Sequence, residues 1–196
     1  MQINKQHLFP TPIYTLTDVL EPKERDGLAE WMPTVMSRSD LELDPRTAQL
    51  MQQIERMVDS ITQDLKYAPM EYTCTGMWAN ENHKGHGHLA HTHSNNWLSG
   101  VYYPHDSDTA LEFWDPRSAA TVLQPKIEEF TRENSKTWQH APRANTMIVF
   151  PSWLQHSVPN NTQSRPRLSM AFNIMMCGLV GDKDDKQQGD FGQFIG

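Results

Sequence analysis

Three histidines in this chain have the residue type and spacing of metal ligands. His91 and His93 stand two positions apart, and His156 follows far downstream. Residues two apart in a β-strand face the same side, so the first two imidazoles can converge on one ion, with His156 as a third ligand from a distant strand. Imidazole binds iron, zinc, copper and nickel, so the pattern predicts a metal site without naming the metal.

Arg167 stands eleven positions after His156 (167 − 156 = 11), and Ser169 follows two residues later. An apolar run, LSMAFNIMM, begins directly after the arginine. An unpaired guanidinium on such a strand would be costly to desolvate, and its rigid fork matches a carboxylate. In isolation, Arg167 could also be a surface ion-pair residue, which is the less favoured interpretation. Together with the histidines, it favours a site that binds a small dicarboxylate, with the Ser169 hydroxyl on the same side.

Length and charge narrow the class of protein. At 196 residues the chain is long enough for one domain with its own core. The formal net charge is −7 and the basic residues are scattered, which disfavours a nucleic-acid partner. No stretch approaches the ~18 apolar residues of a membrane span, and no secretory signal is evident, so we expect a cytoplasmic protein. Cys74 and Cys177 are expected to be reduced thiols.

Helical patterns occupy the first third of the chain. A short helix is predicted over Glu21–Met32, beginning around Pro22. In a second helix, Asp44 is the expected N-cap and Pro45 the first helical residue. Apolar residues at 3.6-residue spacing should bury one face of this helix against a sheet. These residues are Leu50, Met51, Ile54, Met57, Val58, Ile61 and Leu65.

From Glu71 onward, short runs rich in β-branched and aromatic residues alternate with turn residues. The predicted strands are Tyr72–Asn80, Trp97–Tyr103, Leu111–Trp114, Thr146–Phe150, Leu154–Val158 and Arg167–Met175. Helices followed by many short strands predict a single α+β domain over residues 1–180. Residues 118–143 are expected to form a long polar excursion with a helical turn at Ile127–Phe130. Residues 181–196, rich in glycine and charge, are expected to be a flexible tail.

The chain resembles the 2-oxoglutarate- and Fe(II)-dependent oxygenases, and within them a group from bacteria and phages. The segments that carry the resemblance are LFPTPIY, WANENHKGHGHLAHTHSNNWLSGVYY, LEFWDPR, FPSWLQHSV and RLSMAFN. The resemblance implies an α+β fold with a double-stranded β-helix core (jelly roll, cupin-like) and N-terminal helices packed on one sheet. It also implies Fe(II) at the open end of that core, 2-oxoglutarate as a small-molecule co-substrate that chelates the iron, and O2 as a reactant.

The resemblance further implies roles for individual residues. The implied iron ligands are His91, His93 and His156. Arg167 and Ser169 would take the distal carboxylate of 2-oxoglutarate. Asn80 and Tyr102 are predicted to support the co-substrate, although ordinary hydrogen bonding within a sheet explains either of them as well. The implied reaction is hydroxylation of a primary substrate with release of succinate and CO2; the sequence names neither that substrate nor the oligomeric state.

His93 departs from the superfamily pattern, in which His-x-Asp or His-x-Glu precedes a distant histidine. Three interpretations follow. His93 can be an iron ligand in an all-imidazole triad, which is the interpretation we favour. It can also be a spectator beside a two-histidine site that water completes, or the register can shift so that His88 or Asn95 takes part. Neutral ligands leave the charge of the dication uncompensated, so halogenation stays open beside hydroxylation.

The main alternative function is a cupin-like metalloprotein that is not an oxygenase, such as an isomerase or a metal- and ligand-binding protein. This alternative explains the histidines but leaves Arg167 and Ser169 without a role. A relative that has kept the fold and lost catalysis is the third possibility. Stabilisation of the folded protein by 2-oxoglutarate only when Fe(II) or Mn(II) is present discriminates among the three.

Overall fold

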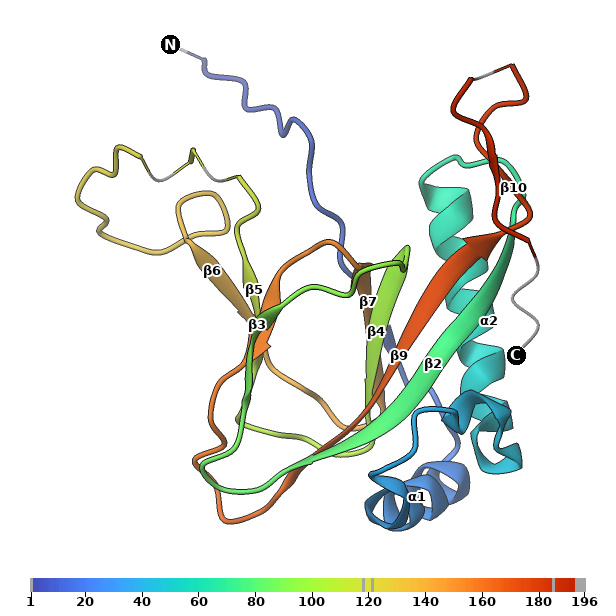
Figure 1. The fold of residues 1–196 in the computed structure, drawn as a ribbon. Helices are drawn as coiled ribbons and strands as arrows, with labels where there is room; N and C mark the ends of the chain where they lie inside the picture. Colours follow the sequence, from blue (N-terminus) through green and yellow to red (C-terminus); the bar gives the residue numbers. More distant parts are fainter. Residues whose placement is uncertain (1, 118, 121, 185, 193–196) are drawn as a thin grey trace.

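Two antiparallel sheets form the centre of the computed structural model, which describes residues 2–117, 119–120, 122–184 and 186–192 (Figure 1). The larger sheet has the strand order β1 (Tyr14–Thr17), β7 (Thr146–Pro151), β4 (Leu98–Tyr103), β9 (Arg167–Cys177) and β2 (Glu71–Asn82). The smaller sheet has the order β3 (His88–His91), β8 (His156–Val158), β5 (Leu111–Trp114) and β6 (Thr137–His140). A two-stranded ribbon, β10 (Leu179–Val180) with β11 (Gly189–Asp190), follows β9.

Two helices, α1 (Pro22–Trp31) and α2 (Ala48–Asp64), lie on the face of the larger sheet that points away from the smaller one (Figure 1). The apolar stripe of α2 packs onto sheet residues such as Met77 and Phe172. Its buried members are Leu50, Ile54, Met57, Val58 and Ile61. Each such side chain contributes about 1.5–3 kcal/mol through removal from water. The predicted packing of N-terminal helices on one sheet is confirmed.

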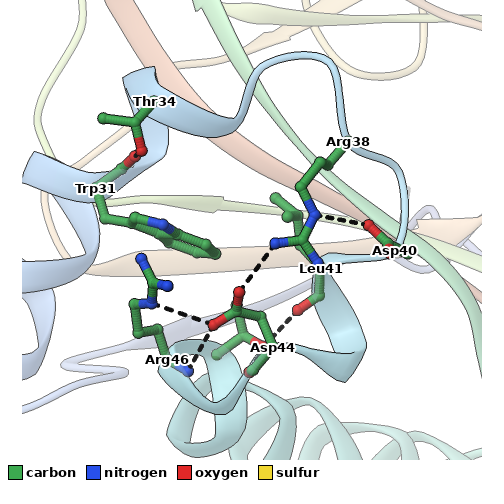
Figure 2. A network of polar contacts seen from close by, with 8 residues as sticks. Trp31, Thr34, Arg38, Asp40, Leu41, Asp44 and Arg46 are labelled. Atoms are coloured by element: carbon green, nitrogen blue, oxygen red, sulfur yellow. Dashed lines mark hydrogen bonds and ion pairs between the residues drawn. The ribbon is translucent and has the colours of Figure 1, made fainter.

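Between the helices the chain forms three short 3-10 turns, Met32–Val35, Leu41–Leu43 and Pro45–Thr47. Asp44 caps the last of these turns, and α2 begins at Ala48, slightly later than predicted. The Arg46 backbone N–H donates to Asp44 Oδ1 at 3.1 Å, and Arg38 donates to Asp44 Oδ2 at 3.0 Å (Figure 2). Both bonds hold the pKa of the Asp44 carboxyl below its ordinary value, and the bond from the Arg46 backbone N–H has the larger effect. The network fixes the entry into α2.

The predicted strands are confirmed as β2, β4, β5, β7, β8 and β9, with ends displaced by at most two residues. β1, β3, β6 and the ribbon were not predicted. β6 lies inside the predicted polar excursion, whose residues 118 and 121 are outside the described part. The helical turn predicted at Ile127–Phe130 is wrong, because Glu128 and Glu129 form a bend. Residues 185 and 193–196 of the predicted tail are also outside the described residues, and its flexibility stays a prediction.

The apolar space between the two sheets is a second core. It contains Tyr103, Leu111, Phe113, Ile148, Phe150, Leu154 and Val158. Successive residues of a strand face opposite sides, so Tyr103 joins this inter-sheet core while Tyr102 joins the core under the helices. Gly100 pairs with Phe172 across β4 and β9, and a Cβ at Gly100 would collide with the Phe172 ring. Among the described residues, no helix combines the length and apolarity needed to cross a membrane.

Candidate functional site

The three predicted metal-ligand histidines meet between the two sheets. His91 on β3 is paired with His156 on β8, and their ring centroids lie 4.4 Å apart. The His93 ring lies 5.1 Å from each of the other two. One nitrogen of each ring lies within 4.8 Å of the corresponding atoms of the others. The three imidazoles are therefore within reach of one ion.

His93 reaches this position by a different route from the one that strand periodicity predicts. β3 ends at His91, so His93 lies beyond the strand. Its backbone N–H donates to the carbonyl of Ser152, in the turn between β7 and β8, at 3.0 Å. The Trp78 ring from β2 stacks on the His93 ring, with centroids 5.8 Å apart and planes 18° from parallel. Backbone pairing to the turn and the aromatic stack thus place the third ring.

Backbone carbonyls orient the other two rings. His91 Nδ1 donates to Leu89 O at 2.7 Å, and His156 Nδ1 donates to Leu154 O at 2.9 Å. Because a carbonyl oxygen only accepts, each Nδ1 carries the proton and each Nε2 keeps its lone pair for a metal. Burial lowers the pKa of His156 to about 4, and burial followed by the nearby His91 lowers the pKa of His93. Both are neutral near pH 7, the form that ligates metals.

Arg167 is 3% exposed and lines the same cavity. Its Nε donates to Thr109 O at 3.2 Å, and its Nη1 donates to Ser169 Oγ at 3.1 Å and Asn82 Oδ1 at 3.4 Å. Its Nη2 donates to the Tyr103 hydroxyl at 3.1 Å. Among the described residues, no carboxylate forms an ion pair with it. A buried cation with only neutral partners favours binding of an anion.

The direction of these hydrogen bonds prepares Ser169 and Tyr103 for an anion. A guanidinium only donates, so both hydroxyl oxygens accept from Arg167 and their own protons are left for another acceptor. Burial raises the pKa of Tyr103, which keeps its hydroxyl protonated. A carboxylate presents two acceptor oxygens and suits this group of donors.

A single cavity joins the histidines to Arg167. The cavity and the solvent space at its mouth together measure roughly 480 Å³. Ser169 and Asn80 also line this cavity. Six of the seven predicted site residues therefore surround one space, and Tyr102 does not. The Tyr102 hydroxyl donates to Asn145 Oδ1 at 3.0 Å on the helix side of the sheet. Side chains alternate along β4, so Tyr103, four residues after Ser99, faces the site instead. This alternation would have predicted Tyr103 from the sequence.

Sequence reasoning gave no role at the site to two further residues of this region, Asn82 and Trp78. Both lie two residues from Asn80 on β2, so the strand period that brings Asn80 to the cavity would also have pointed to them. It named His88, which also lines the cavity, only as an alternative ligand. His83 and His86 lie exposed in the loop between β2 and β3.

Comparison with known families decides the class of protein. The family model described as "Putative 2OG-Fe(II) oxygenase" matches residues 76–173, a span that contains the three histidines, Arg167 and Ser169. This chain belongs to that family of 2-oxoglutarate- and Fe(II)-dependent oxygenases. Its cofactor is Fe(II), and 2-oxoglutarate and O2 are its co-substrates, as predicted. A search of curated proteins found no match to the sequence.

Several solved structures have the same fold as this oxygenase. HygX from Streptomyces hygroscopicus, solved with nickel and 2-oxoglutarate bound, is 12% identical with a TM-score of 0.62, over 84% of this chain and 82% of HygX. A Pseudomonas putida prolyl-4-hydroxylase is 16% identical with a TM-score of 0.60, over 86% and 89% of the two chains. The epimerase SnoN from nogalamycin biosynthesis is 12% identical with a TM-score of 0.63, over 94% and 84%. The likeness confirms the predicted α+β fold with a double-stranded β-helix core.

Proposed function

We propose that this oxygenase is a hydroxylase in which Fe(II) is held by His91, His93 and His156. Arg167 and Ser169 bind the distal carboxylate of 2-oxoglutarate. One observation carries the proposal: the histidine triad and a buried arginine without a carboxylate partner among the described residues open into the same cavity. The histidines and the arginine match the two ends of 2-oxoglutarate, the 2-oxo acid that chelates a metal and the carboxylate that pairs with a guanidinium.

The charges of the site support a dianionic co-substrate. Three neutral imidazoles compensate none of the charge of Fe(II), and Arg167 adds a further positive charge in a buried position. Binding of 2-oxoglutarate brings two carboxylates and removes most of this excess. An enzyme with a carboxylate ligand already compensates part of the metal charge, so we expect the co-substrate here to contribute more to metal retention.

A polar network supports the ring of His93. The Ser99 hydroxyl donates to Asn173 Oδ1 at 2.8 Å and lies 2.8 Å from the hydroxyl of Ser152, which therefore donates to it. The Asn173 side chain in turn hydrogen-bonds to His93. Ser152 also accepts the backbone N–H of His93, so ring and backbone are held by the same small group of residues. Such outer contacts fix a ligand in one orientation.

Apolar residues exclude water from the wall behind His156. The Phe150 ring lies 4.8 Å from the His156 ring at 67°, and Phe113 packs on Phe150 with centroids 4.9 Å apart. When bound, iron supplies the oxidation of a substrate C–H bond with O2 and 2-oxoglutarate, releasing succinate and CO2. The residues of the chain bind the two carboxylates, orient the ligand rings and keep one side of the cavity dry.

The test is an anaerobic titration with Fe(II) and then 2-oxoglutarate, following the visible metal-to-ligand charge-transfer band. We expect a band in the wild type, none in His156→Ala, and one that needs about 10- to 150-fold more 2-oxoglutarate in Arg167→Ala. His86→Ala and Arg117→Ala are matched controls, because both residues are exposed and away from the cavity. Absence of the band in the wild type contradicts the proposal.

Turnover products test the reaction type separately. With O2 admitted, hydroxylation gives succinate together with a product that has gained one oxygen atom. SnoN, which shares the fold, is an epimerase, so a product of unchanged mass would replace hydroxylation by an isomerising reaction. Mass spectrometry of reactions with a panel of candidate substrates distinguishes the two outcomes.

A further inference from the structure

His88 faces the cavity because of an irregularity in β3. It lies three residues before His91, and residues three apart in a regular strand face opposite sides. Here His88 pairs with Val158 and His91 pairs with His156, so three steps on β3 (91 − 88) oppose two on β8 (158 − 156). The extra residue turns His88 onto the same side as His91, and both line the cavity.

Asn82 links His88 to the arginine at the anion-binding end. Asn82 Oδ1 accepts from Arg167 Nη1 at 3.4 Å, and because arginine only donates, the amide oxygen must face it. The amide nitrogen of Asn82 then faces His88 Nε2 at 3.1 Å and donates to it. In a neutral imidazole the other nitrogen carries the proton, so His88 Nδ1 is a donor. Among the described residues, no acceptor for this proton is found.

His88 is not placed to be a metal ligand in this arrangement. The cluster of ligand atoms formed by the described residues contains His91, His93 and His156 only, and the Nε2 atom of His88 is engaged by Asn82. The ring is half-buried beside Arg167, and burial, followed by the charge of that arginine, lowers the pKa of His88. A neutral ring adds a donor to the site without adding a second positive charge.

We propose that His88 is a further binding residue for the distal carboxylate of 2-oxoglutarate, to which its Nδ1–H donates beside Arg167. The inference rests on the proposed function. It follows from three features: the side chain lines the cavity, Asn82 joins it to the guanidinium, and its tautomer leaves one donor for a ligand. The carboxylate then accepts from the free N–H of Arg167, from the Ser169 hydroxyl and from His88.

Calorimetric titration of the Mn(II)-loaded protein tests this role without catalysis. The two ligands are 2-oxoglutarate and 2-oxopentanoate, which has the same chelating end and no distal carboxylate. In His88→Gln the amide lies near the position of Nε2, and in His88→Asn it lies near that of Nδ1. We expect His88→Gln to weaken 2-oxoglutarate binding about 10-fold and to leave 2-oxopentanoate binding unchanged. His88→Asn should retain more of the affinity for 2-oxoglutarate.

Two controls make the result specific. Arg167→Ala should show the same selective loss for 2-oxoglutarate, and His86→Ala should change neither ligand. Mn(II) affinity and thermal unfolding, measured in parallel, should be the same in both His88 variants as in the wild type. Equal weakening of both ligands, or unchanged 2-oxoglutarate binding in His88→Gln, overturns the role of His88. A wild type that binds Mn(II) and neither ligand overturns the proposed function itself, and the inference with it.

Discussion

His91 and His156 are directly paired across β3 and β8, and each donates its Nδ1 proton to the carbonyl two residues before it in the chain. The same local contact therefore orients both rings, and strand pairing then brings their Nε2 atoms together. His93 lacks this contact and depends instead on the Trp78 stack and on Asn173. The triad is built from two equivalent residues and one different residue, which makes His93 the position to test.

Replacement of a residue that only supports a metal ligand typically weakens metal binding about 10- to 100-fold. If His93 is itself a ligand, His93→Ala should weaken metal binding by more than this. His93→Asp should bind Fe(II) or Mn(II) more tightly than His93→Ala, because it restores a carboxylate that compensates the metal charge. Competition with a coloured chelator measures both. Wild-type metal affinity in His93→Ala would instead support the two-histidine site completed by water.

Tyr102 and Tyr103 give a matched pair for the register of β4. Tyr103→Phe removes the acceptor of Arg167 Nη2 and leaves a buried N–H unpaired, so we expect 2-oxoglutarate affinity to fall about 5- to 10-fold, from about 1–1.4 kcal/mol. Tyr102→Phe removes the bond to Asn145 and should lower the free energy of unfolding by about 1 kcal/mol, with co-substrate binding unchanged. Calorimetry and urea unfolding separate the two effects; a larger binding loss in Tyr102→Phe would contradict the assignment.

Local patterns predicted most of the fold. The apolar residues from Leu50 to Ile61 recur with the period of a helix, and the runs that form β4, β5 and β7 have the composition of strands. Both kinds of element could therefore be predicted. β3 was missed because its sequence, His88–His91, is only four residues long, has no β-branched residue and pairs only with β8. β6 was missed because it is equally short and depends on pairing with β5.

The site was predictable where one local rule suffices. Arg167 and Ser169 lie two apart on a regular strand, and both line the cavity. His91 and His93 also meet, although the strand argument does not hold, because β3 ends between them. His88 could not be found in this way, because a register shift in β3 places it and leaves no signal in the sequence. Asn82 lies two residues after Asn80, just beyond the predicted end of the strand, and pairs with Arg167 on β9.

Cys74 should react slowly with alkylating reagents in the folded protein. Burial on β2 raises the pKa of its thiol to about 11, and only the thiolate reacts. At pH 8 about 0.1% is thiolate, against roughly a quarter at the ordinary value near 8.5. The alkylation rate should therefore rise about tenfold per pH unit up to about pH 11. Mass spectrometry after timed iodoacetamide treatment measures it at Cys74; rapid labelling at pH 8 without denaturant would contradict the prediction.

The raised pKa also sets the sign of a stability effect. A thiol whose folded pKa exceeds its unfolded value favours the native state fully below about pH 8.5. This contribution is lost as the pH rises towards about 11. Replacement of Cys74 by alanine should therefore remove part of the alkaline destabilisation, and unfolding in urea at pH 7 and pH 10 measures the difference. An equal pH dependence in the variant would assign the alkaline loss to other groups.

Asn82→Asp should turn the anion-binding end of the cavity into an internal ion pair. Asn82 is 4% exposed, is paired with Arg167 across β2 and β9, and already directs its Oδ1 at the guanidinium. A carboxylate in this position pairs with the arginine that we propose binds 2-oxoglutarate, so we expect 2-oxoglutarate affinity to fall at least about 10-fold. Binding of 2-oxopentanoate, which has no distal carboxylate, should be retained.

Asn80→Asp is the control for charge alone, because Asn80 lines the same cavity from the same strand and pairs with Ser169 rather than with Arg167. Its effect on 2-oxoglutarate affinity should be the smaller of the two. Equal losses in both variants would show that added negative charge, and not occupation of the guanidinium, is responsible. Unchanged 2-oxoglutarate binding in Asn82→Asp would count against a role for Arg167 in co-substrate binding, because a neutralised guanidinium should attract a ligand carboxylate less strongly.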